Sequence, residues 1–143
     1  MNSEKKSDKL WEGIEPTAEL VANALALAQR DLRTAEHNFK NEDYDWSFAI
    51  SYNAMLQAGR ALMFSKGVRP TGEYKHVSVI EFVKTAFGQQ FADNLLYMFN
   101  KIRKKRHTAV YEQVNSISPE EARNALKVAK EFLEKVATLI PTK

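Results

Sequence analysis

The chain has 143 residues, which is the size of a single domain with one hydrophobic core. Its 21 lysines and arginines exceed its 18 aspartates and glutamates by only three, so where the charges cluster matters more than the net charge. The absence of cysteine excludes disulfides, thiolate metal sites and a cysteine nucleophile.

The three histidines do not indicate a metal site. His37, His76 and His107 lie in three separate segments and lack the spacing of metal ligands, so we expect no metal and no cofactor. The charged N-terminus is not followed by an apolar run, and no stretch approaches ~18 apolar residues. We therefore expect a cytoplasmic protein that does not cross a membrane.

Residues 1–16 read as a polar N-terminal tail, and residues 17–143 as a helical domain. Within the tail, Trp11 is expected to dock on the domain surface. The first helix is predicted from Thr17 to about Lys40, because its apolar residues recur at alternating steps of three and four.

The second helix is predicted to be central to the bundle. Asp43 or Asp45 can cap its start, and Gly67 is suited to end it. It carries two apolar stripes instead of one, which is typical of a helix that is surrounded by others. Its small residues, including Ala58 and Gly59, would allow a neighbouring helix to approach closely.

Residues 67–75 read as a connection, because they include Pro70 and Gly72. Helices are then predicted over residues 76–87, 90–113 and 118–140. The last begins with Ser118-Pro119-Glu120-Glu121, a strong helix-start signal. No strand is indicated, so the predicted fold is an all-α, up-and-down bundle of four long helices and one short helix.

The densest chemical signal is the basic stretch from Lys101 to Arg106 in the fourth predicted helix. Arg106 continues the apolar stripe of Phe99 and Ile102, a position where a guanidinium needs an anionic or hydrogen-bonding partner. Arg103, His107 and Tyr111 follow one another at intervals of four on an adjoining face. We predict a phosphate or RNA site here, with Arg103, Lys104 and Lys105 as further binding residues.

The chain resembles a HEPN domain. One branch of that family carries Ala-x-Tyr-Tyr-Ala-Met-x-x-Ala-x-Arg-Ala-Leu in its second helix, and residues 50–62 read Ile-Ser-Tyr-Asn-Ala-Met-Leu-Gln-Ala-Gly-Arg-Ala-Leu. The same branch carries Arg-Asn-x-Ala-x-Tyr late in its fourth helix, where residues 106–111 read Arg-His-Thr-Ala-Val-Tyr. The resemblance extends over about residues 18–140.

This resemblance implies a homodimer with two such motifs across a cleft, and in many members a metal-independent ribonuclease. The family's active pattern is an arginine, a polar residue and a histidine four to six positions after the arginine. Carried over to this chain, the arginine is Arg106 and the polar residue is His107. Tyr111 stands where the family has the histidine of the pattern. The predicted catalytic roles are charge stabilisation by Arg106, acid and base catalysis by His107 from each copy, and substrate orientation by Tyr111.

Two other functions remain open. Domains of this branch often work with a minimal nucleotidyltransferase as toxin and antitoxin, which would make Tyr111 a possible acceptor of a nucleotidyl group. The chain could also bind nucleotides or RNA without cutting them.

Simpler interpretations exist for each residue. The lysines can form a solvated face. Arg106 can pair with Asp45 or Glu121 in a structural ion pair. Tyr52 and Tyr111 can be packing residues, and His37 and His76 are assigned no role.

Overall fold

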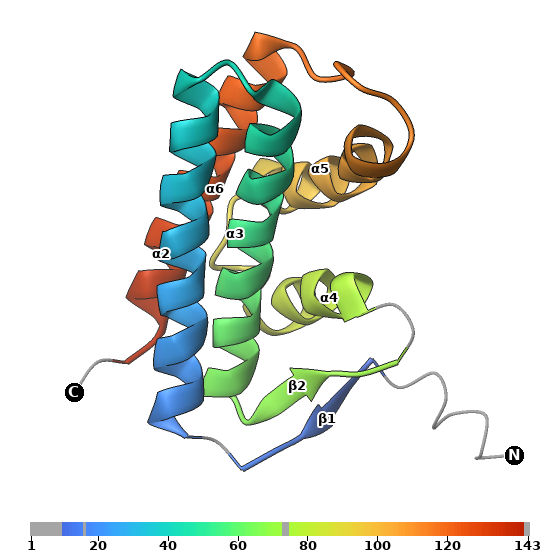
Figure 1. Cartoon of the computed structure of the whole chain (residues 1–143). Helices are drawn as coiled ribbons and strands as arrows, with labels where there is room; N and C mark the ends of the chain where they lie inside the picture. Colours follow the sequence, from blue (N-terminus) through green and yellow to red (C-terminus); the bar gives the residue numbers. More distant parts are fainter. Residues whose placement is uncertain (1–9, 16, 73–74, 142–143) are drawn as a thin grey trace, which may run out of the picture.

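The computed structural model describes residues 10–15, 17–72 and 75–141. In chain order its elements are β1 (Trp11–Gly13), α2 (Ala18–Lys40), α3 (Tyr44–Ser65), β2 (Val68–Pro70), α4 (Lys75–Phe87), α5 (Asp93–Tyr111) and α6 (Pro119–Leu139). Helices α2, α3 and α6 lie alongside one another, whereas α4 and α5 are inclined to them (Figure 1). The prediction of an all-α fold with four long helices and one short helix is confirmed.

Helix α3 is the centre of the molecule, as predicted. It packs against all four other helices and against β2. Both of its apolar stripes are buried, with Tyr52, Met55 and Leu62 fully enclosed. A side chain on almost any face of α3 therefore meets another element of the fold.

The helix ends follow local chemistry that the sequence displays. Thr17 caps α2 by accepting a hydrogen bond from the Leu20 amide at 3.1 Å. Ser118 and Glu121 form a reciprocal capping box at the start of α6. After α3, Gly67 adopts a φ of 75°, the left-handed conformation that glycine tolerates best. These three predicted boundaries are confirmed.

A two-stranded antiparallel sheet corrects the prediction that the chain has no strand. Glu12 of β1 is paired with Arg69 of β2, in a register that also joins Trp11 to Pro70. The ring centroids of Trp11 and of Phe82 in α4 lie 5.2 Å apart with the rings nearly perpendicular, so Trp11 does dock on the helical domain. The pairing joins segments more than fifty residues apart, which neither local sequence could indicate.

Gly59 brings α3 and α4 into close contact. A Cβ atom at this position would lie only 2.5 Å from Cγ1 of Val79. The predicted close approach at Gly59 is confirmed, and the neighbour is the short helix α4. This packing fixes where the N-terminal end of α4 lies relative to α3.

Among the described helices, none has the length and apolar character needed to cross a membrane.

Candidate functional site

A tyrosine of α3 and a histidine of α4 form the centre of the candidate site. Tyr52 is fully buried, and its Oη lies 3.1 Å from Nδ1 of His76, within hydrogen-bonding distance. His76 is the second residue of α4 and remains partly exposed. The pair therefore links the buried core to a surface that a ligand can reach.

Arg106 of α5 completes this cluster. Ile102 and Phe99, one and two turns earlier on the same stripe, are buried and hold this face of α5 against the core. The stripe brings the guanidinium of Arg106 over the Tyr52 ring, with Cζ 5.6 Å from the ring centroid.

The alternative in which Arg106 pairs with Asp45 or Glu121 is wrong. Glu121 binds Nζ of Lys105 at 2.7 Å, and Asp45 accepts hydrogen bonds from the backbone amides of Asn115 and Ile117. Asp45 thus ties the α5–α6 connection to the start of α3. Within the described residues Arg106 has no carboxylate partner, so its charge is available to an external anion.

Burial and the two arginines set the protonation of the Tyr52–His76 pair. Burial raises the pKa of the Tyr52 hydroxyl, and the positive charges of Arg106 and Arg103 oppose that rise only partly. For His76, burial lowers the pKa, and Arg106 and Arg103 lower it further. Near neutral pH the tyrosine therefore keeps its proton while the imidazole is uncharged and can accept one.

The predicted binding residues on α5 fall into different surroundings. Arg103 acts electrostatically on Tyr52 and His76, while its Nε donates a hydrogen bond to Oδ1 of Asn100 at 3.1 Å. Lys105 is engaged with Glu121, and Lys104 is exposed. Of these three, only Arg103 belongs to the cluster around Tyr52.

His107 and Tyr111 lie outside that cluster. The Tyr111 residue is 67% exposed and the His107 side chain 64% exposed. Their ring centroids are 5.2 Å apart, and Nε2 of His107 lies 3.4 Å from a carboxylate oxygen of Glu112. The structure thus joins His107 to Tyr111, as their helical spacing predicts, but does not join either to Arg106.

Tyr52 and His76 are the residues of the site that sequence reasoning missed. A partial signal existed for Tyr52, because it is a polar side chain in the most buried helix and part of the second-helix motif. No pattern in the sequence around His76 indicates that this residue contacts Tyr52. In the part of the chain that the structure describes, no group of three or more potential ligands is placed to hold a metal ion.

The bundle and its site define a class of helical domain in which the penultimate helix presents arginines beside a tyrosine–histidine pair. The model of the HEPN domain family matches residues 22–139, and the chain belongs to this family. It is also similar to a protein of Methanocaldococcus jannaschii named "Putative toxin MJ0142", with 28% identity over 121 residues. That match covers 81% of this chain and 78% of the relative.

Proposed function

We propose that this protein is a toxin-like HEPN domain that binds RNA phosphates and cleaves RNA without a metal ion in the cytoplasm. The observation that carries the proposal is the guanidinium of Arg106 lying against the Tyr52–His76 pair without a carboxylate partner among the described residues. Arg103 adds a second positive charge to the same place. The similarity to the relative named "Putative toxin MJ0142" supports the toxin-like part of the proposal.

The chemistry of this proposal uses the ribose as its own nucleophile. The 2′-oxygen attacks phosphorus, the bond to the 5′-oxygen breaks, and the products end in a 2′,3′-cyclic phosphate and a 5′-hydroxyl. In this proposal Nδ1–H of the uncharged His76 donates to Oη of Tyr52, which fixes the orientation of the ring. Its Nε2 can then accept the proton of the 2′-hydroxyl. Arg106 can bind two phosphate oxygens and stabilise the charge that develops on them.

His107 and Tyr111 contribute to the proposed function from outside the cluster around Tyr52. Both side chains are exposed on α5, where they can meet substrate or a second copy of the chain. A homodimer that packs beside α5 would bring His107 of one copy toward the cleft of the other. In that arrangement, His107 can protonate the leaving 5′-oxygen.

Cleavage assays on purified protein test this proposal and separate the two histidines. Single-stranded and structured RNAs are incubated with EDTA present, and the ends of the products are analysed. We expect cyclic phosphate ends and a loss of ~10²-fold or more for His76→Gln, the usual contribution of a general base. His37→Gln, on the exposed surface of α2, is the matched control. Full activity of His76→Gln would exclude the base assigned here.

A second function is favoured by the exposure of Tyr111. Its ring is two-thirds exposed, whereas Tyr52 is fully buried, so an enzyme can reach only the former. In this alternative the protein is the partner of a minimal nucleotidyltransferase. The phenolic oxygen of Tyr111 bonds to the α-phosphorus of ATP, pyrophosphate leaves, and a base takes the phenol proton.

Mass spectrometry after incubation with such an enzyme and ATP tests the alternative. We expect one added adenylyl group that is lost in Tyr111→Phe. Tyr97→Phe is the matched control, because Tyr97 is 63% exposed on the same helix. Modification that persists in Tyr111→Phe would assign the acceptor elsewhere.

A further inference from the structure

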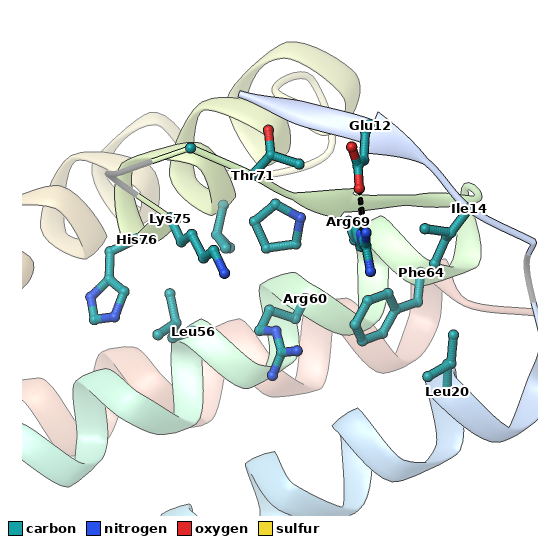
Figure 2. Close-up of a pocket in the computed structure, with 13 residues that line it drawn as sticks. Glu12, Ile14, Leu20, Leu56, Arg60, Phe64, Arg69, Thr71, Lys75 and His76 are labelled. Carbon is teal, nitrogen blue, oxygen red and sulfur yellow. Dashed lines mark hydrogen bonds and ion pairs between the residues drawn. The ribbon is translucent and has the colours of Figure 1, made fainter. Parts of the chain in front are cut away.

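A large cavity lies next to the Tyr52–His76 pair and is not explained by cleavage chemistry. Its volume is about 870 Å³, within the range typical of small-molecule sites. Figure 2 shows its walls: the strands with Glu12 and Arg69 on one side, α3 with Arg60 and Phe64 below, and the start of α4 with Lys75 and His76.

The lining combines an apolar wall with positive charge. Leu56 and Phe64 of α3 and Val79 of α4 form the apolar part, and the exposed Leu20 of α2 extends it. A flat, weakly polar ligand group can be sheltered by such a wall. The apolar wall by itself is compatible with many ligands, so the class of ligand depends on the charged side chains beside it.

Among the described residues, three cations and one carboxylate line the cavity, so this part of its lining is positive overall. Arg69 is neutralised by Glu12, with Nε of the arginine 2.6 Å from Oε2 of the glutamate. Arg60 donates instead to the neutral amide oxygen of Gln57 at 3.0 Å and lies over the Phe64 ring. Neither Arg60 nor Lys75 has an ion pair with a described residue, so both can bind an anion.

The cavity and the catalytic cluster share His76. An anionic ligand in the cavity therefore lies beside His76, which in turn contacts Tyr52. An apolar wall next to Arg60 and Lys75, which have no ion pair within the described part of the chain, suits a ligand with a planar ring at one end and a phosphate at the other. The Glu12 carboxylate, which also binds Arg69, can accept hydrogen bonds from the N–H groups of such a ring.

We propose that this cavity is a nucleotide-binding pocket that takes one nucleoside monophosphate unit. The base lies against Leu56, Phe64 and Val79, and the phosphate lies between Arg60 and Lys75. The unit is either a free nucleotide or one residue of an RNA chain that continues past His76 to Arg106. The RNA version rests on the function proposed above, whereas the free-nucleotide version does not.

Titration calorimetry with AMP, GMP, CMP and UMP tests the pocket, with inorganic phosphate and ribose 5-phosphate as probes that lack a base. We expect at least one nucleotide to bind ~10-fold or more tightly than both base-free probes. Arg60→Gln should weaken it by ~10-fold or more, because a charge-assisted hydrogen bond is lost. Lys75→Gln should weaken it as well, and because this side chain is exposed the change should leave the fold intact.

Arg33→Gln is the matched control, since it removes the same charge from the exposed face of α2 and should leave nucleotide affinity unchanged. Equal affinity for nucleotides and inorganic phosphate would overturn the pocket, as would nucleotide affinity that is unaltered in both Arg60→Gln and Lys75→Gln.

A short single-stranded RNA distinguishes the two sources of the ligand. If Arg60→Gln weakens RNA and mononucleotide binding by a similar factor, the pocket holds a unit of the RNA chain. If only the mononucleotide is affected, the ligand is a free nucleotide. The ribonuclease proposal can fail independently of the pocket. In that case the protein does not cut RNA, yet it still binds nucleotides and Arg60→Gln still weakens this binding.

Discussion

The Oη atom of Tyr52 lies 3.1 Å from Nδ1 of His76, joining the buried centre of α3 to the exposed end of α4. The tyrosine is fully buried, whereas the histidine reaches the surface. A change in the charge or contacts of His76 can therefore affect Tyr52 in the core.

Removal of the Arg106 charge should raise the pKa of His76. Burial is the main cause of its lowered pKa, and the positive charge of Arg106 is the next. In Arg106→Gln the protonated imidazole loses a repulsive neighbour, so the pKa should move back toward the ordinary value of 6.5. NMR titration of the His76 ring measures this shift. Arg33→Gln should leave the titration unchanged, and an unaltered His76 pKa in Arg106→Gln would contradict the electrostatic contact.

Acidification should destabilise the fold through His76. Its pKa is lower in the folded protein than in the unfolded chain, so between these two values the unfolded chain binds more protons. The free energy of unfolding should therefore decrease as the pH falls below about 6.5 and through the folded pKa.

Urea unfolding at several pH values measures this dependence, and His76→Gln should remove it. The contribution of Glu121 is separate, because the hydrogen bond from Lys105 lowers its pKa below 4.5, and its stabilisation is lost only at more acidic pH. A pH dependence between 5 and 7 that persists in His76→Gln would point to another group.

Gly59→Ala should destabilise the protein by about 1–3 kcal/mol, the usual cost of overpacking a core. The new Cβ would lie 2.5 Å from Cγ1 of Val79, so α4 would have to move. Val79→Ala removes that methyl group. The double variant should therefore lose less stability than the sum of the two single variants. Strict additivity in denaturant unfolding would show that α4 is not held by this contact.

The protein should form a dimer of twice 16.3 kDa at tens of micromolar, as measured by light scattering. The exposed face of α5 carries Tyr97 and Tyr111, which helical spacing places on the same side. Tyr97→Lys adds a cation beside Lys101 on this face and should weaken a dimer that buries it. Trp46→Lys, on α3, is the control for a general effect of the added charge. A monomeric wild-type protein would remove the composite cleft.

The helices could be predicted because their signals are local. The capping box of Ser118 and Glu121, the left-handed Gly67 and the close approach at Gly59 each depend on residue types that are visible in the sequence. The pairing of β1 with β2 could not be predicted, since it depends on backbone contacts between distant segments whose side chains show no strand pattern.

The site was predictable only on the helix that carries the basic stretch. Periodicity placed Arg106 on the inward stripe, where the structure has it, but could not say that Tyr52 and His76 lie opposite. The sequence places His107 directly after Arg106, which suggests that the two side chains act together. Successive residues on a helix point in directions about 100° apart, however, and do not face one another. Helical period identifies a buried face, whereas the partners of that face depend on tertiary packing.

The strand β1 and the residue that follows it contribute to the pocket from outside the part of the chain that matches the family model. Glu12 and Ile14 line the nucleotide-binding pocket, yet both precede residues 22–139, which match the family model. Substitutions in this short leading segment can reshape the pocket without touching the core of α3. Two relatives with the same bundle and the same arginines could in this way acquire different ligands, and the bundle alone would not reveal the difference.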